Sequence, residues 1–343
     1  MRAAIMRKFG NPDVLSVEKM TRPEPKPGEV LVRILATGLN RLDHYVRDGS
    51  VTREMALPHV LGSDASGVVE VLGEGVTEFH IGDRVIPMPG YPLQFEDALS
   101  EPLSAAPSYT IRGLVEWGTY AQFMVVPAQW LLRDETGLAP EEVAALPMPL
   151  VTGVRAVKVV GRVTAGEFVL VHAGASGTGS MNIQIARALG ARVATTVRSA
   201  HKAEFVKALG AELVLQLDDP SFADQLLDWS DGKGVHVVID NLGGDVMPRS
   251  LDVMRPLGRL VSMGMVAGLE STIQLRPLFF AQKQILGTLM GDVDDMRWGL
   301  DQVRAGNVRP LVDETFPLGK AAAAHQRLAA GEARGNIVLL PWA

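Results

Sequence analysis

Hydrophobic and polar residues alternate in two different ways along the chain, and the change between them divides it into two parts. Short apolar runs separated by glycine and proline fill the first 125 residues, for example Glu29–Leu35 and Val68–Leu72. Short strands with such punctuation predict a small β-rich barrel or sandwich-like domain. Between residues 151 and 287, buried strand patterns alternate with helical ones. This alternation predicts an α/β domain with a doubly wound parallel sheet.

The second part is organised around the stretch 168–180. Phe168–Val171 is continuously apolar, which indicates a buried parallel strand, and a turn of Gly, Ala and Ser follows it. A helical pattern then places Met181 and Ile185 on one face, and Gly190 is suited to end that helix. Free N–H groups and the positive end of the helix dipole make such a turn an anion site. We expect a dinucleotide pyrophosphate there, although glycines in this spacing also serve turns that only need small residues.

The remaining elements follow from the same patterns. Residues 89–117 show little periodicity, and residues 288–343 end in an alanine-rich helix and a strand that complete the first domain. The first domain is thus expected at 1–150 and 288–343, and the second at 151–287. Further strands are expected at 191–197, 212–215, 235–240, 259–264 and 284–290, and helices at 200–209, 221–229 and 245–256.

Composition narrows the classes of function. The chain has 343 residues, 47% hydrophobic and 21% charged, so it can bury a large core. A formal net charge of -6 without a long basic run argues against nucleic acid as a partner. The chain has no cysteine, which excludes disulfides and thiolate metal sites and fits a cytoplasmic location. No apolar run is long enough for a membrane span or a signal core, so no membrane partner is expected.

Four short runs resemble the motifs of one enzyme family. They are Gly38–Tyr45 (similar to G-V-N-P-x-D-x-Y), Leu61–Val69 (P-G-x-D/E-x-A/S-G-V-V), Gly82–Val85 (G-D-R-V) and His172–Gln184 (H-x-A-x-S-G-x-G-x-x-x-x-Q). Their order and spacing, over nearly the whole chain, resemble the medium-chain dehydrogenase/reductase superfamily and its zinc-independent quinone oxidoreductase (zeta-crystallin-like) branch. The resemblance implies a Rossmann dinucleotide-binding domain, a β-rich GroES-like catalytic domain and an NAD(P)H-dependent oxidoreductase.

Zinc-containing members of that superfamily hold a catalytic zinc at three positions, which align here with Asn40, Ser63 and Met148. None of these side chains is an ordinary zinc ligand, and the softer thiolates are absent. The lobe that carries a structural zinc on four cysteines in those members corresponds to residues 89–117, which hold no cysteine. We therefore expect no metal.

The resemblance also bears on which dinucleotide binds. In NAD-binding members an acidic residue ends the second strand and bonds the ribose 2′-hydroxyl. Val197 stands at that position, followed by Arg198, Ser199 and, one turn into the next helix, Lys202. Two cations and a hydroxyl favour a 2′-phosphate, so NADPH is preferred and NADH stays open. Alternatively, the two cations are ordinary solvated surface charges.

The other cofactor contacts are expected at the carboxyl ends of the strands. Thr152 corresponds to a family residue that helps to fix the nicotinamide ring; alternatively, it caps a helix expected at 153–159. The complete set of expected cofactor-binding residues is Thr152, Ala175, Ser176, Gly177, Thr178, Gly179, Arg198, Ser199, Lys202, Asn241, Gly264 and Met290.

Chemistry without a metal favours conjugated substrates. Reduction of a simple ketone needs a group that holds the developing alkoxide, as zinc does, and is harder to support without it. An enone or quinone spreads the charge over an oxygen that hydrogen-bond donors can stabilise. Asn40 and Tyr45 are the expected donors, with Asp43 as an orienting neighbour; Tyr45 is also a candidate proton donor. Plain packing of Tyr45 and a fold-supporting Asp43 bonded to backbone are the alternatives.

The resulting prediction is a zinc-independent, NADPH-dependent oxidoreductase that transfers hydride to a small-molecule substrate, either a quinone or an α,β-unsaturated carbonyl. An alcohol/aldehyde dehydrogenase-like enzyme is the alternative within the superfamily. A dinucleotide-binding sensor or structural protein with little turnover is an alternative of another class. The resemblance further implies a homodimer in which the strand near Gln284–Met290 pairs edge to edge with its copy.

Overall fold

The computed structural model describes residues 1–343, which form two compact units. The sequence predicts that residues 288–343 return to the first domain, whereas in the structure 295–309 belongs to unit 2. Helix α9 (Val293–Arg304) explains this difference, because its Gly299 leaves no room for a Cβ beside Leu150. Unit 1 comprises Met1–Met148, Asp292–Asp294 and Pro310–Ala343, and unit 2 comprises Pro149–Gly291 and Asp295–Arg309.

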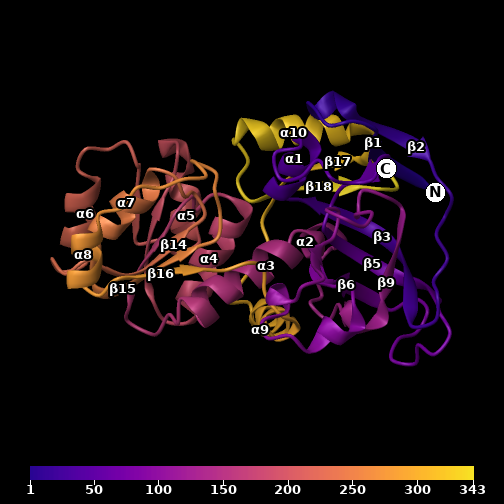
Figure 1. The fold of residues 1–343 in the computed structure, drawn as a ribbon, viewed down its shortest axis with the longest axis horizontal. Coiled ribbons are helices and arrows are strands. Elements are labelled where there is room, and N and C mark those ends of the chain that lie inside the picture. The colour runs from indigo at the N-terminus through magenta and orange to yellow at the C-terminus, as the bar shows by residue number, and fades with distance from the viewer. The chain divides into compact units, whose positions relative to one another are not determined.

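Unit 2 contains a six-stranded parallel sheet, which confirms the predicted doubly wound fold (Figure 1). Its strand order is β13-β12-β11-β14-β15-β16, so the chain reverses direction across the sheet between β11 and β14. In such sheets a ligand binds outside the carboxyl ends of the strands at this reversal. The strands are β11 (Phe168–Val171), β12 (Arg192–Thr196), β13 (Leu213–Leu215), β14 (Val235–Asp240), β15 (Met254–Ser262) and β16 (Gln284–Gly287).

Helices connect these strands close to where the apolar periodicity predicts them. The helix after β11 is buried over Gly179–Ala186, so it lacks the polar face of an ordinary surface helix. The helix near residue 150 starts earlier than expected, which places Thr152 inside it and rules out the N-cap role. These helices are α3 (Pro147–Val154) with a π-helical continuation (Arg155–Val160), α4 (Gly177–Ala188), α5 (Ala203–Ala208), α6 (Phe222–Trp229), α7 (Val246–Asp252) and α8 (Leu275–Phe280).

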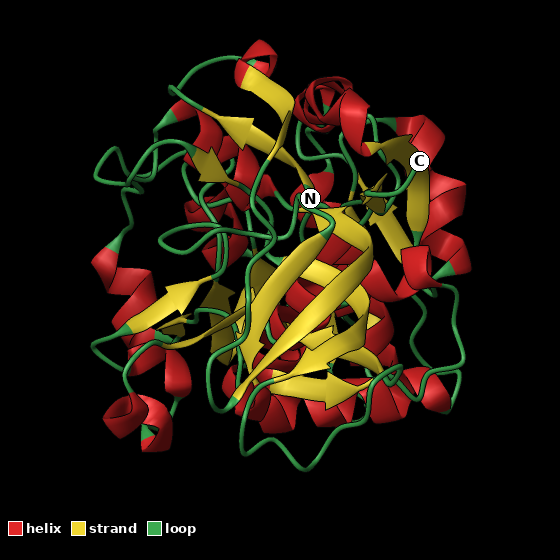
Figure 2. Cartoon of the chain, turned by 90° about the vertical axis from the view of Figure 1, so that its right-hand side faces the viewer, coloured by secondary structure: helices red, strands yellow, loops and turns green.

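Unit 1 is β-rich, as the short apolar runs predict, and its long strands are strongly twisted (Figure 2). Strand β3 is its centre, pairing with β5, β9 and the C-terminal β18. Its strands are β1 (Arg2–Met6), β2 (Leu15–Lys19), β3 (Glu29–Leu39), β4 (His59–Val60), β5 (Asp64–Leu72), β6 (Arg84–Pro87), β7 (Gly90–Pro92), β8 (Tyr109–Ile111), β9 (Phe123–Pro127), β10 (Leu131–Arg133), β17 (Val312–Pro317) and β18 (Asn336–Leu340); its helices are α1 (Arg41–Asp48), α2 (Pro140–Ala144) and α10 (Ala321–Ala330).

The aperiodic stretch 89–117 is a small lobe in which β7 pairs antiparallel with β8. Its turns are tied by the Asp97 carboxylate, which accepts hydrogen bonds from the Ser108 N–H (2.9 Å) and hydroxyl (2.6 Å). The Tyr91 ring stacks on Trp130 with centroids 5.6 Å apart. Hydrogen bonds and a ring contact therefore hold this segment, for which the sequence predicts no regular structure. None of the helices in the chain is long and apolar enough to cross a bilayer.

Candidate functional site

The small-residue turn between β11 and α4 has the geometry of a phosphate cradle. Ser176 is the N-cap of α4, and its hydroxyl oxygen accepts a hydrogen bond from the Gly179 N–H (3.0 Å) while its O–H donates to the Ala173 carbonyl (2.8 Å). None of the hydrogen bonds in this turn uses the N–H groups of Gly177 or Thr178. Two N–H donors at the positive end of a 12-residue helix thus remain for an anion.

Close packing explains why this turn needs glycine at two positions. A Cβ on Gly174 would lie 2.1 Å from the Thr195 Oγ1, and one on Gly179 would lie 2.1 Å from the Ala173 carbonyl oxygen. Ala173 itself has φ of 51°, in the left-handed region that costs a residue with a Cβ about 1–2 kcal/mol. The turn therefore holds a tight conformation that brings its backbone to the surface of the strand ends.

The residues after β12 lie at the adjacent strand end. Val197 is buried and donates its N–H to the Leu215 carbonyl, so no acidic side chain stands where a ribose-binding carboxylate would. Arg198 is exposed and Ser199 half-buried, but Lys202 is only 6% exposed. The interpretation of Lys202 as a solvated surface charge is therefore wrong, because the residue is buried within unit 2.

Four further expected cofactor residues form two contacts in unit 2. The Thr152 hydroxyl contacts the Met290 sulfur at 3.8 Å, and Met290 has φ of 51°. Gly264 follows β15 and lies against Asn241, whose carbonyl oxygen would be 2.3 Å from a Cβ on this glycine. The Asn241 Oδ1 is buried without a hydrogen-bond partner. Because β11, β12, β14 and β15 are neighbouring parallel strands, the residues after them share one edge of the sheet.

In unit 1, antiparallel pairing brings Asn40 next to Asp64. Gly38 on β3 is paired with Asp64 at the start of β5, and Asn40 follows two residues later as the N-cap of α1. The Asn40 Nδ2 donates to the Asp64 Oδ2 (2.9 Å) and, more weakly, to the Ser63 hydroxyl (3.4 Å). The Asn40 side chain therefore makes no cap contact of its own, and its amide is engaged with the acid.

The Asp43 carboxylate binds three donors inside unit 1. It accepts from the N–H groups of Asn40 (2.7 Å) and Gly62 (3.1 Å) and from the Tyr120 hydroxyl (3.0 Å). Burial raises its pKa to about 6, although these hydrogen bonds act in the opposite direction. Asp43 thereby ties the start of α1 to the loop before Ser63, which is the contact set of a positioning residue.

Tyr45 lies half-buried on α1, where the edge of its ring contacts His44 with centroids 5.7 Å apart. Burial raises the pKa of its hydroxyl above the ordinary value, so the group is protonated at neutral pH. It is thus in the chemical form that a hydrogen-bond or proton donor needs.

Asp64 is the site residue for which the sequence indicated no role. It is 1% exposed, and its Oδ1 accepts a hydrogen bond from the Met148 N–H (2.9 Å). Burial raises its pKa to about 8, with a smaller contribution from the Asp43 charge. An acidic residue at the buried start of strand β5 was the available signal, but its partner Asn40 lies 24 residues away.

The donors near Asn40 do not fit a zinc ion. Asn40, Ser63 and Asp64 supply one amide, one hydroxyl and one carboxyl group, and the Asn40 amide donates to both of the others. No group of three or more His, Cys, Asp or Glu side chains is arranged to hold a metal. A catalytic zinc site has three protein ligands drawn from Cys, His, Asp and Glu, and Asp64 is the only such residue among these three.

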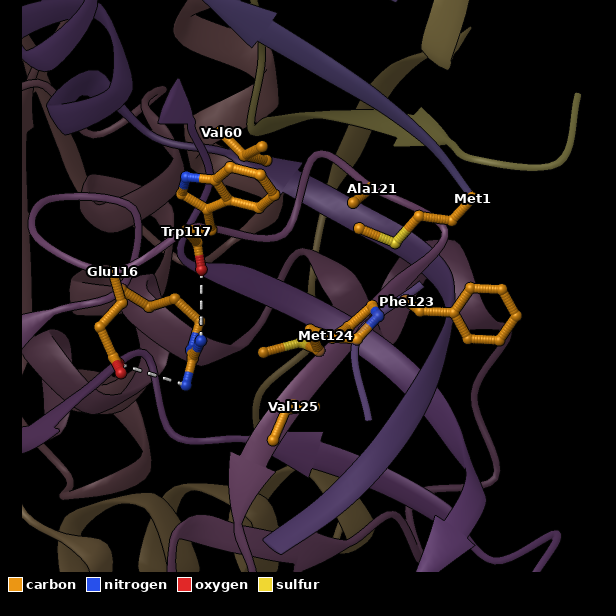
Figure 3. A pocket seen from close by; sticks show the side chains of 11 residues that line it. Met1, Val60, Glu116, Trp117, Ala121, Phe123, Met124 and Val125 are labelled. Carbon is orange, nitrogen blue, oxygen red and sulfur yellow. Dashed lines mark hydrogen bonds and ion pairs between the residues drawn. The ribbon is translucent and has the colours of Figure 1, made fainter. Parts of the chain in front are cut away.

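A cavity of about 200 Å³ on unit 1 is separate from these residues (Figure 3). Apolar side chains such as Met124 and Val125 line it, together with the Trp117 indole. Arg112 donates to the Trp117 carbonyl (3.3 Å) and pairs with Glu116 (3.6 Å) at its rim. None of the expected catalytic or cofactor residues lines it.

Comparison with known proteins finds a matching protein family for each of the two units. The family described as Alcohol dehydrogenase GroES-like domain matches residues 26–136, and Zinc-binding dehydrogenase matches residues 177–305. A 2-haloacrylate reductase from Burkholderia sp is 32% identical, over 99% of each chain. A quinone oxidoreductase from Pseudomonas aeruginosa is 32% identical, over 97% of each chain. A solved NAD-dependent alcohol dehydrogenase is 36% identical with a TM-score of 0.95, over 99% of each chain.

The matched domains correspond to the two parts that the hydrophobic pattern separates, and the relatives extend over almost the entire chain. The GroES-like unit and the Rossmann unit occur in the order that the four motifs indicate. This protein belongs to the medium-chain dehydrogenase/reductase superfamily, in its quinone oxidoreductase branch.

Proposed function

We propose that the chain is a zinc-independent reductase that transfers hydride from NADPH to quinones or α,β-unsaturated carbonyl compounds. The observation that carries the proposal is the Asn40 amide, held by buried groups at the position where zinc members carry a metal ligand. Relatives named quinone oxidoreductase and 2-haloacrylate reductase support both substrate classes, since each name describes a hydride acceptor in which a carbonyl group is conjugated with a C=C double bond.

The residues of unit 2 fit a dinucleotide. The two N–H donors of Gly177 and Thr178 suit a pyrophosphate, and Gly174 and Gly179 allow the close packing that holds this turn in its tight conformation. Thr152 and Met290 are the proposed contacts of the nicotinamide, with Asn241 and Gly264 beside them. When bound, the dihydronicotinamide supplies the hydride.

The reaction balances with one hydride and one proton. For an enone, hydride adds to the β-carbon, the negative charge moves to the carbonyl oxygen, and a proton then adds to the α-carbon. The Asn40 amide and the Tyr45 hydroxyl are the proposed donors to that oxygen. Tyr45 or solvent supplies the proton. Asp43 takes no part in bond making; through Asn40 and Gly62 it positions the segment that carries the donors.

Turnover measurements test the function directly. Purified protein should oxidise NADPH with a benzoquinone and with a cyclic enone, and more slowly with a saturated aldehyde. Turnover with the aldehyde alone would favour the alcohol/aldehyde dehydrogenase alternative. Tight NADPH binding without turnover on any acceptor would favour the sensor alternative. One stoichiometric zinc in protein purified without chelator would contradict the zinc-independent assignment.

The preference for NADPH rests on the end of β12. No carboxylate opposes a 2′-phosphate there, and Arg198, Ser199 and Lys202 offer two cations and a hydroxyl. The solved relative named NAD-dependent makes NADH the competing cofactor. Arg198→Ala should weaken NADPH binding about tenfold or more and leave NADH binding unchanged. Arg192→Ala, at the amino end of the same strand, is the matched control; equal losses for both cofactors would contradict the preference.

We further propose that the protein is a homodimer through the edge of the unit 2 sheet. Strand β16 ends that sheet, with β15 as its only neighbour. Large apolar side chains are exposed in the segments around it, including Phe279 (62%), Phe280 (70%) and Leu289 (51%). An unpaired edge beside such side chains is typical of a surface that another chain covers.

A further inference from the structure

The hydrogen bond between Asn40 and Asp64 can form in two ways, which differ in the protonation of Asp64 and the orientation of the Asn40 carboxamide. The two oxygens of Asp64 face different partners: Oδ1 accepts from the Met148 N–H (2.9 Å), and Oδ2 faces the Asn40 carboxamide (2.9 Å). The Met148 N–H has no lone pair to receive a proton, so a protonated Asp64 carries its hydrogen on Oδ2. That hydrogen then points at Asn40 and needs an acceptor there.

The carboxamide of Asn40 can meet either form of the acid. Its nitrogen donates to a carboxylate, and after a half-turn about the last side-chain bond its oxygen accepts from a carboxylic acid. The other end of the amide makes no hydrogen bond within the chain and is not among the buried atoms without a partner. Whichever end is turned away from Asp64 is therefore the end presented to solvent or substrate.

We propose that Asp64 is a positioning residue that selects which end of the Asn40 carboxamide faces the substrate. As a carboxylic acid it donates to the Asn40 oxygen and leaves the NH₂ group turned outward as a donor. As a carboxylate it takes the NH₂ group and leaves the carbonyl oxygen turned outward. Only the first arrangement stabilises an oxyanion on an enone or quinone, because the second presents a lone pair to the developing charge. This inference rests on the proposed reductase function.

The surroundings of Asp64 favour the acid near neutral pH. Asp64 is 1% exposed, and α1 contributes the neighbouring Asp43 carboxylate. Tyr120, before β9, is a neutral phenol at these pH values because burial raises its pKa well above the ordinary value. The segment at Met148 contributes an N–H, and β3 contributes Gly38, which is uncharged. Burial and the neighbouring acid raise the pKa of Asp64 to about 8.

The expected signature is an alkaline loss of activity. With a pKa of about 8, the donor arrangement is about tenfold less populated at about pH 9 than at about pH 7. The kcat/KM for a cyclic enone, whose own groups do not titrate in this range, should fall by that factor with saturating NADPH. A wild-type kcat/KM that stays level between these pH values would overturn the proposal.

The variant Asp64→Asn separates this effect from other causes of pH dependence. Its amide oxygen can accept from the Met148 N–H while its NH₂ donates to the Asn40 oxygen, which imitates the protonated acid. The ratio of kcat/KM at the two pH values should shrink from about tenfold to less than twofold. Asp231→Asn, at an exposed position, should keep the wild-type ratio. A full alkaline loss in Asp64→Asn would overturn the proposal.

Infrared difference spectroscopy gives a readout that needs no turnover. Subtraction of the Asp64→Asn spectrum from that of the wild type should reveal a carboxylic acid C=O band near neutral pH that disappears by about pH 9. Absence of this band at neutral pH would overturn the proposal even in a protein that oxidises NADPH. Conversely, lack of turnover with every acceptor, with the band present, would reject the reductase function and leave the protonation of Asp64 intact.

Discussion

At the scale of single residues, a chain of buried side chains in unit 1 has a fixed direction of donation. The Arg47 guanidinium can only donate, so the His325 Nδ1, 2.8 Å away, must be an acceptor. A neutral His325 then carries its hydrogen on Nε2, facing the Tyr120 oxygen at 3.2 Å, and the Tyr120 hydroxyl donates to Asp43. Burial and the Arg47 charge lower the pKa of His325 to about 3, which keeps the ring neutral. This series of hydrogen bonds thus ends at the Asp43 carboxyl group, which must accept the hydrogen bond from Tyr120.

Tyr120→Phe tests this chain of donors. Tyr120 is fully buried, and the substitution leaves Asp43 without one donor and the His325 N–H without an acceptor. We expect the free energy of unfolding in urea to fall by about 1–3 kcal/mol. Tyr45→Phe, which removes a hydroxyl that is half-buried, should change it by less than about 0.5 kcal/mol. Equal effects of the two substitutions would contradict the assigned donors.

The ionisation of Asp64 also predicts how stability depends on pH. The pKa of Asp64 is raised from 3.8 to about 8 on folding, so the native state binds the proton more tightly. Its stabilising contribution is complete below about pH 4 and is lost as the pH rises through about 8. Asn at this position cannot ionise. In urea unfolding, the free energy of unfolding of Asp64→Asn relative to that of the wild type should therefore rise by several kcal/mol between about pH 4 and about pH 8. A difference that does not change with pH would contradict the raised pKa.

At the scale of elements, the turn between β11 and α4 keeps its shape only if the Gly179 backbone can lie close to the Ala173 carbonyl. Gly179→Ala places a methyl group 2.1 Å from the Ala173 carbonyl oxygen, so the first turn of α4 must move. Because the N–H donors of this turn are the proposed pyrophosphate contacts, NADPH affinity should fall about tenfold or more in a fluorescence titration. Gly319→Ala, where a Cβ meets nothing within 4 Å, is the control and should bind normally. Unchanged affinity in Gly179→Ala would argue against this turn as the cofactor site.

At the scale of the whole molecule, the exposed apolar side chains next to β16 allow a test of the proposed homodimer through the edge of the unit 2 sheet. Phe279→Glu with Phe280→Glu changes two side chains that the monomer already exposes, so the fold should persist. If a partner covers them, the dissociation constant of the dimer should rise at least tenfold in sedimentation experiments. Phe95→Glu, at a residue of unit 1 that is 78% exposed, should leave the dimer intact. A wild-type protein that sediments as a monomer would reject the homodimer.

The sequence alone was sufficient for the parts of the fold that depend on neighbours in the chain. The apolar run Phe168–Val171, the small-residue turn and the helix after it are local patterns, and the structure forms each of them as β11, the turn and α4. The burial of α4 over most of its surface was not predictable from its periodicity, because the neighbours that cover it come from distant segments. The same holds for α9, whose place in unit 2 follows from contact between Gly299 and Leu150.

What the sequence determined by itself was the family, the two-part architecture and the small-residue turn between β11 and α4, because these depend on spacing within short motifs. What only the tertiary structure decided was the polar environment of the candidate donors. Asp64 meets Asn40 across 24 residues of sequence, and Tyr120 meets His325 across 205. Hydrogen-bond partners and burial set the charge of an acid, and neither is determined before the strands pair. Whether Asn40 presents a donor or an acceptor is therefore a property of the folded protein.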